Sequence, residues 1–195
     1  MIGVDIIDRK AILPRTAEKI QRYRNKIMLS EEQKCLDAHF DLETAMWVAW
    51  SLKESVYKLE YKQKAIRYFR PKSIEVQSSN QCHSNEFKFT LKGRFGDYTA
   101  KVELNDQYIQ ALALASSIAL TEVYVQSFFL EATDPISSST KCREKLNSYL
   151  NDQFSQNSIM IIEDEYPRLV AEKGWNYDLS ISHHAHWGCF ALQKC

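Results

Sequence analysis

The sequence has no long apolar run, no paired cysteine motif and no excess of either charge, and each absence excludes a class of protein. The longest apolar stretch, residues 109–120, is too short and too interrupted to span a bilayer. The five cysteines are odd in number and form no C-x-x-C pair, which favours reduced thiols in a cytoplasmic protein over a disulfide framework. The start, MIGVDIID, has an acid at its fifth position and no positively charged leader, so no signal peptide is expected.

The formal net charge is zero, but basic residues are concentrated in two stretches. Residues 9–26 contain seven basic side chains and one acid, and residues 62–72 contain five basic side chains and no acid. Two local basic surfaces on a neutral protein suit an anionic ligand or an acidic partner, although solvated helix faces give the same pattern. Because the chain has no recognisable nucleic-acid motif and no net positive charge, nucleic-acid binding is not expected.

Mixed helical and strand patterns predict an α+β protein with largely antiparallel connections. Helices are expected at 14–28, from residue 30, at 41–61 and at 141–154, and strands at 2–7, 73–76, 87–91, 98–104, 109–115, 122–130, 158–162 and 178–192. The polar stretch 77–86 is expected to be a loop.

The stretch 131–140, with a proline and four consecutive Ser/Thr residues, is the expected linker. It divides an N-terminal half, residues 1–130, from a C-terminal part, residues 141–195, within one compact unit. Both parts contain helix and strand segments and end in an apolar strand, which suggests two related halves.

The first segment with chemical potential is Gly3-Val4-Asp5, in the first expected strand. A carboxylate inside an apolar strand is costly to bury unless a cation or hydrogen-bond donors satisfy it. Asp5 is therefore a candidate metal ligand, and the alternative is an aspartate that accepts hydrogen bonds from backbone amides.

The second segment is WSLKESVYK, residues 50–58, on the longest expected helix. Glu54 and Lys58 are four residues apart and share one face of that helix. An exposed Glu–Lys pair would be ordinary, but the aromatic side chains of Trp47, Trp50 and Tyr57 predict a mostly buried helix. A carboxylate and an ammonium on a partly buried face can bind Mg²⁺ and a phosphate side by side.

The third segment is SISHH, residues 180–184, followed by His186. Strand alternation places Ser180, Ser182 and His184 on one face and His183 on the other. Three nearby histidines could suggest zinc, but the chain supplies no paired cysteines and no H-E-x-x-H motif. Serine hydroxyls beside an imidazole are also suitable donors to a phosphate.

In this order, the three segments resemble the motifs of the 4′-phosphopantetheinyl transferase superfamily, namely G-x-D, W-x-x-K-E-x-x-x-K and S-x-S-H. The order, with G-x-D first and S-x-S-H last, is similar to that of the holo-acyl-carrier-protein synthase type. The resemblance implies an α+β fold with antiparallel sheets, packed helices and two similar halves. It also implies a Mg²⁺-dependent transfer of phosphopantetheine from coenzyme A to a serine of an apo acyl carrier protein, releasing 3′,5′-ADP.

By this resemblance, Asp5 and Glu54 hold Mg²⁺, Glu54 is the base and Lys58 stabilises the charge of the phosphates. The residues expected to contact coenzyme A are Lys53, Ser182, His183 and His184. The basic residues 9–26 are expected to attract the acidic helix of the carrier protein.

The chain departs from the family pattern at several points. Ile7 stands where the larger, surfactin-synthetase-activating type carries another metal-binding acid, so water is expected to replace that ligand. The G-K-P element ahead of S-x-S-H is reduced to Pro167. Because residues 73–154 also contain extra material, we expect a monomer with two similar halves, and a homotrimer is the alternative. The alternative function is a relative that binds a carrier protein or coenzyme A without catalysis.

Overall fold

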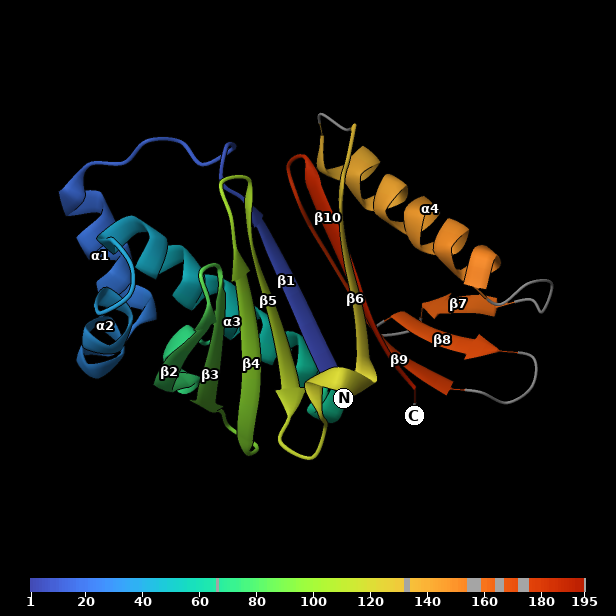
Figure 1. Ribbon diagram of the computed structural model, residues 1–195, viewed down its shortest axis with the longest axis horizontal. Coiled ribbons are helices and arrows are strands. Elements are labelled where there is room, and N and C mark those ends of the chain that lie inside the picture. The colour runs from blue at the N-terminus through green and yellow to red at the C-terminus, as the bar shows by residue number, and fades with distance from the viewer. Residues whose placement is uncertain (66, 132–133, 154–158, 164–166, 172–175, 195) are drawn as a thin grey trace.

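The computed structural model describes residues 1–65, 67–131, 134–153, 159–163, 167–171 and 176–194, which form two antiparallel sheets with packed helices (Figure 1). The expected α+β class is therefore confirmed. The first sheet has five strands in the order β1-β5-β4-β3-β2. Their bounds are Ile2–Asp8 for β1, Glu75–His83 for β2, Glu86–Lys92 for β3, Asp97–Leu104 for β4 and Tyr108–Ala115 for β5.

Three helices lie between β1 and β2 in the chain: α1 at Ala17–Ile27, α2 at Ser30–Asp37 and α3 at Leu42–Lys64. The long helix α3 begins after Asp41, whose carboxylate accepts the backbone amides of Glu43 and Thr44 at 3.0 Å each. It ends at Ala65, which has a left-handed φ of 52°. The helix packs against β1 and β5, and their apolar side chains form the largest core cluster.

Gly3 allows α3 to lie unusually close to β1. A Cβ atom added to Gly3 would be 1.9 Å from the backbone oxygen of Ser55, so no larger residue fits without a shift of helix or strand. The glycine of the G-x-D motif is thus required by the packing of α3. This close approach also places the middle of α3 beside Asp5, which lies in the same strand as Gly3.

The second sheet also has five strands, in the order β6-β10-β9-β8-β7. Their bounds are Val123–Phe129, Trp187–Lys194, Asn176–His184, Pro167–Ala171 and Ile159–Glu163, in that order, and helix α4, Pro135–Gln153, packs against β9 and β10. In each sheet the first strand in the chain pairs with the last strand, and helices follow the first strand. The two sheets therefore share one connectivity, and their inner strands lie side by side in Figure 1.

The free edge of β1 is joined to the second sheet by side chains of β9. Every second residue of β1 donates its backbone N–H to every second side chain of β9. The pairs are Ile2–Asp178 at 2.6 Å, Val4–Ser180 at 2.9 Å, Ile6–Ser182 at 3.4 Å and Asp8–His184 at 3.0 Å. We call this row of contacts the β1–β9 ladder. It satisfies amides that an edge strand would otherwise leave without partners in the interior.

Three expectations about secondary structure were wrong, namely the polar loop, the single last strand and the linker. The stretch expected to be a polar loop, 77–86, lies mostly in β2, an edge strand whose polar side chains are largely exposed. The expected last strand, 178–192, is a hairpin of β9 and β10 that turns at Ala185, with φ of 47°. Glycine or asparagine usually marks such a turn, and neither is present here.

The expected linker, 131–140, contains the first turns of α4, which begins at Pro135 because proline suits the first turn of a helix. Strand β6 already belongs to the second sheet, so the division between the sheets lies at residues 116–122 rather than at the expected linker. Among the described residues, no helix is both long enough and apolar enough to cross a membrane.

We expect Gly3→Ala to lower the free energy of unfolding by about 1–3 kcal/mol, the usual range for overpacking a core. The added methyl group would overlap the Ser55 backbone oxygen, which cannot rotate away. Chemical denaturation with urea measures the change. Ala119→Ser, which adds one atom at an exposed position, is the control, and equal stability of the two variants would contradict the packing argument.

Candidate functional site

Helix α3 presents Glu54 and Lys58 to a cleft beside the second sheet. The cleft has a volume of about 290 Å³ and is lined from α3 and from the second sheet by Glu54, Tyr57, Lys58, Tyr61, Lys62, Pro167, Leu179, Ser180 and Ile181. The expectation that Glu54 and Lys58 share one face of a helix therefore agrees with their position. Sequence reasoning did not identify Lys62, which lies one helical turn beyond Lys58, or its ion-pair partner Asp178.

The centre of the site is a set of hydrogen bonds among Asp5, Lys58 and Ser182. The Lys58 ammonium donates to Asp5 Oδ1, to Ser182 Oγ and to the Val4 carbonyl, each at 2.9 Å. Ser182 in turn donates to Asp5 Oδ1 at 2.9 Å and accepts the amide of Ile6 at 3.4 Å. The fold thus brings together Asp5 of β1, Lys58 of α3 and Ser182 of β9. Each of the three sequence segments supplies one residue of this cluster.

The charges in this cluster affect one another strongly. Burial raises the pKa of Glu54 above its ordinary value, Asp5 raises it further and Lys58 opposes both. For Lys58, burial disfavours the ammonium, but the carboxylates of Asp5 and Glu54 outweigh burial and raise its pKa. Lys58 is therefore charged at neutral pH, and Glu54 is a stronger base than an exposed glutamate.

The two neighbouring histidines have different surroundings. His184 uses Nδ1 to accept the amide of Asp8 at 3.0 Å, so that nitrogen carries no proton and serves the β1–β9 ladder. His183 lies on the other face of β9 and is half-buried. Burial lowers the pKa of His183, and the positive charges of Lys58 and Arg143 lower it further. Of the two, His183 makes no ring hydrogen bond with the part of the chain that the structure describes, so both of its nitrogens can serve a new partner there.

Lys53 does not line the cleft, and its expected contact with coenzyme A stays a prediction. Its side chain is fully buried, its ammonium is 2.6 Å from Glu32 Oε1, and it donates to the carbonyls of Pro71 and Ile74 at 3.0 and 2.6 Å. Burial lowers the pKa of Lys53 despite the charge of Glu32. Lys53 therefore holds α2 and the segment before β2 against α3. Burial of this kind cannot be inferred from the motif alone.

Ser182 is fully hydrogen-bonded within the protein at its hydroxyl, and its expected contact with coenzyme A stays a prediction. Its hydroxyl accepts from Lys58 and Ile6 and donates to Asp5, which uses its one proton and both lone pairs. A phosphate could bind Ser182 only by replacing one of these partners. In this structure Ser182 positions the ammonium and the carboxylate relative to each other.

The described residues contain no cluster of three or more His, Cys, Asp or Glu side chains placed to hold a metal ion. The donor set nevertheless fits Mg²⁺ with two protein carboxylates, because this ion usually keeps several waters and uses substrate phosphates as ligands. Asp5 Oδ1 is occupied by Lys58 and Ser182, whereas Asp5 Oδ2 and both oxygens of Glu54 make no hydrogen bond within the described part of the chain. In addition to burial, the charge of Asp5 raises the pKa of Glu54, and a divalent cation would offset this repulsion.

An antiparallel α+β protein with a carboxylate and a lysine in one cleft, and a second carboxylate bonded to that lysine, has the components for binding and transferring a phosphate group. The family model of the 4′-phosphopantetheinyl transferase superfamily matches residues 1–113, which include Asp5, Glu54 and Lys58. The chain therefore belongs to the 4′-phosphopantetheinyl transferase superfamily, whose members use coenzyme A as co-substrate and act on carrier proteins. A comparison with curated proteins found no significant match. The matched region ends before β9, so the assignment of Ser182 to the site depends on the structure.

In metal-free protein at pH 7, we expect Glu54→Gln to raise the midpoint of thermal unfolding. The folded-state pKa of Glu54 is raised above the ordinary value of 4.5, so the ionised carboxylate destabilises the folded state at neutral pH. The gain should shrink as the pH falls towards 4.5 and vanish below it, where the carboxyl is protonated in both states. Calorimetry across this pH range measures the effect. The exposed Glu18→Gln is the control, and a Glu54→Gln variant that unfolds earlier at pH 7 would contradict the assignment.

Proposed function

We propose that this protein transfers the 4′-phosphopantetheine group of coenzyme A to a serine of an apo acyl carrier protein. The observation that carries the proposal is the Asp5–Lys58–Ser182 cluster, whose Lys58 lines one cleft together with Glu54. Both sheets contribute to this cluster, and the cleft beside it lies between α3 and the second sheet, where a ligand can bind. Membership in the family supports the reaction class, and the geometry supports the roles of the individual residues.

The proposed reaction is an attack of the carrier serine Oγ on the β-phosphorus of coenzyme A. The Oγ–P bond forms, the bond from phosphorus to the bridging oxygen breaks, and 3′,5′-ADP leaves with that oxygen. Glu54 accepts the serine proton as the general base. Lys58 remains charged and offsets negative charge on the phosphates. Mg²⁺ held by Asp5 and Glu54 would neutralise further diphosphate charge.

The neighbouring residues suggest how coenzyme A is held. His183, with both nitrogens available, is the proposed contact for a phosphate oxygen, and His184 can contribute only through Nε2. The wall formed by Tyr57, Leu179 and Ile181 is suited to the less polar parts of the ligand.

We also propose that the chain acts as a monomer built from two similar halves that divide between β5 and β6. The shared strand order of the two sheets supports this proposal, because each half has the same connectivity. Asp5 and Lys58 come from one half and Ser182 from the other, so the cluster is complete without a second chain. Light scattering distinguishes this monomer from a homotrimer.

The test of the function is intact-mass spectrometry of apo acyl carrier protein after incubation with this protein, coenzyme A and Mg²⁺. A gain of one phosphopantetheinyl group that EDTA prevents would support metal-dependent transfer. No gain across several unrelated carriers, with coenzyme A still bound in calorimetry, would favour a non-catalytic binding relative.

We expect Glu54→Gln to reduce the transfer rate by about 100-fold or more, because a general base typically contributes that much. The exposed Glu144→Gln on α4, outside the cleft and outside α1, should retain the wild-type rate. Circular dichroism checks that both variants are folded. A fully active Glu54→Gln variant would remove Glu54 from the mechanism, and Asp5→Asn with an unchanged magnesium requirement would remove Asp5 as a metal ligand.

The proposed docking surface for the carrier protein is α1. Lys19, Arg22 and Lys26 are exposed on this helix, whereas Arg24 is buried and pairs with Asp37 at 2.6 Å, so it is not part of the surface expected from residues 9–26. A small apolar pocket of about 160 Å³ lies beside these charges, lined by Arg15, Tyr23, Ile27, Met46, Trp47 and Trp50. A helix that carries acids around an apolar side chain would complement this surface.

We expect Arg22→Glu to raise the KM for the carrier protein by about tenfold, because it places like charges opposite each other, and to leave kcat and the KM for coenzyme A nearly unchanged. Lys92→Glu, which makes the same charge change at an exposed position on β3, is the control. Equal effects of the two variants would contradict docking on α1 and indicate only a response to net charge.

A further inference from the structure

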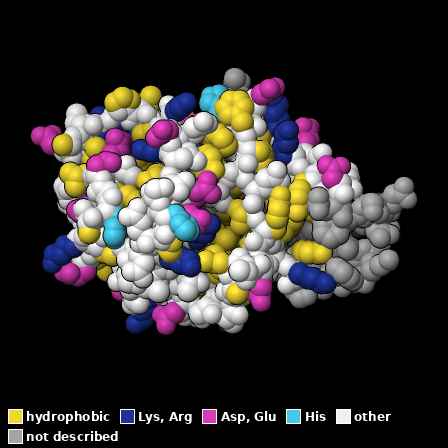
Figure 2. Space-filling view, in the orientation of Figure 1, with side chains coloured by type: hydrophobic (Ala, Val, Ile, Leu, Met, Phe, Trp, Pro, Cys, Tyr) yellow, Lys and Arg dark blue, Asp and Glu magenta, His cyan; other side chains and the backbone are white. Residues whose placement is uncertain are grey.

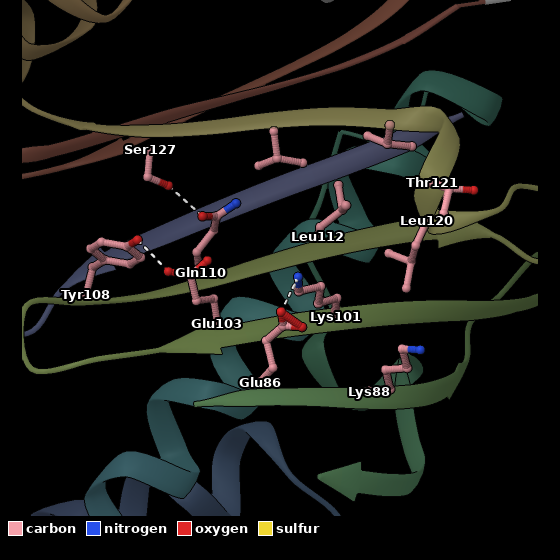
Figure 3. A pocket seen from close by; sticks show the side chains of 12 residues that line it. Glu86, Lys88, Lys101, Glu103, Tyr108, Gln110, Leu112, Leu120, Thr121 and Ser127 are labelled. Carbon is pink, nitrogen blue, oxygen red and sulfur yellow. Dashed lines mark hydrogen bonds and ion pairs between the residues drawn. The ribbon is translucent and has the colours of Figure 1, made fainter. Parts of the chain in front are cut away.

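A second, larger groove lies on the face of the first sheet that α3 does not cover (Figure 3). It has a volume of about 510 Å³ and is lined by β3, β4 and β5 on one side and by residues 120–127 on the other. Its floor consists of side chains that alternate with those of the core beneath α3, so the catalytic cluster lies on the opposite face of the sheet. Figure 2 shows charged side chains gathered near the middle of this face, beside hydrophobic surface.

The wall of this groove is the free edge of β6. Leu130 donates its backbone N–H to His186, which places residues 128, 126 and 124 in hydrogen-bonded pairs with β10. The N–H groups of Val125, Ser127 and Phe129 therefore point away from β10. Within the described part of the chain, these three amides have no hydrogen-bond acceptor.

The edge strand of the first sheet, β1, differs from β6 because its outward amides have hydrogen-bond acceptors. In the β1–β9 ladder, each outward amide of β1 meets a side-chain acceptor. Beside β6, by contrast, the floor presents Lys101, which can only donate, and Glu103, whose Oε1 already accepts the hydroxyl of Tyr108 at 2.6 Å. A side-chain bond from Ser127 to Gln110 at 2.5 Å crosses the groove and leaves the backbone edge open.

The floor carries two rows of opposite charge. Glu86 lies opposite Glu103 in the register of β3 and β4, and Lys88 lies opposite Lys101. Because the two rows are two residues apart along the strands, they are separated by about 7 Å. Lys101 pairs with Glu86 at 2.7 Å, and the remaining charges form no ion pair among the described residues.

We propose that this groove binds an extended polypeptide segment of a partner protein, which adds to β6 as a strand. The free edge offers alternating N–H and C=O groups over several residues, and only a polypeptide backbone repeats the complementary pattern over that length. A small molecule would satisfy one or two of these groups and leave the others without partners. The groove volume also lies within the range of known ligand sites.

The two charged rows on the floor of the groove determine which side chains the bound polypeptide segment should carry. A strand along the groove directs every second side chain to the floor, so one basic and one acidic residue in the pattern base-x-acid would lie over the acidic and basic rows. Leu112 lies opposite Lys101 in the register of β4 and β5, so the basic row also has an apolar side chain beside it. The partner is therefore a protein with an exposed β-forming segment that contains this pattern.

The test uses two labelled peptides of seven residues with the same composition of Thr, Val, Lys and Glu. In one peptide, Lys and Glu are two positions apart and share a face, and in the control peptide they are adjacent. Fluorescence anisotropy at low salt should show the first peptide binding at least tenfold more tightly, because adjacent charges cannot both face the floor. Lys101→Glu should remove this preference. Lys88→Glu, at an exposed position, is the second variant if Lys101→Glu does not fold.

Amide hydrogen exchange provides a separate readout. With the first peptide bound, the amides of Val125, Ser127 and Phe129 should exchange at least tenfold more slowly, whereas that of Gln126, already paired with β10, should not change. Binding without this protection, equal binding of both peptides, or self-association of the protein through β6 in sedimentation would overturn the proposal. The transfer rate should remain unchanged in Lys101→Glu, because this residue lies on the face away from Lys58.

Discussion

The contact between the two sheets depends on the β1–β9 ladder. In this ladder, side chains of β9 take the place of the backbone hydrogen bonds that usually join neighbouring strands. Strand β1 is the edge of the first sheet, and its outward amides would be costly to bury without partners. The side chains of β9 supply those partners at every second residue. The same row fixes where β9 lies against β1, and it thereby fixes the distance between the acid of the first sheet and the serine of the second.

The site is consequently arranged before any ligand binds. Ser182 belongs both to this row and to the cluster around Lys58, so one hydroxyl links the architecture to the chemistry. The close packing permitted by Gly3 brings α3 within reach of Asp5 from the other side. A site of this kind holds its charged groups in place at the expense of burying them near like charge, and burial and the charge of Asp5 both raise the pKa of Glu54.

The acid and the lysine of the site could be predicted from sequence because the spacing of Glu54 and Lys58 is local to one helix. The burial of Lys53 and Arg24 could not, because it depends on partners from α2 that are distant from each motif. The turn at Ala185 was missed for lack of glycine or asparagine. The β1–β9 ladder is reflected in the sequence as an alternation of polar residues through 178–184. The alternation alone does not show that these side chains accept the amides of β1, because that depends on how β9 is aligned with β1.

The alternation in β9 also restricts how the two sheets can move. If β9 shifted by one residue along β1, the apolar side chains of Leu179 and Ile181 would face the amides that now meet Asp178 and Ser180. A shift that restores the acceptors needs two residues, or about 7 Å, and has no stable intermediate position. Sliding of the two sheets past each other is therefore disfavoured as a way to open the cleft, and the relative position of Asp5 and Ser182 is preserved.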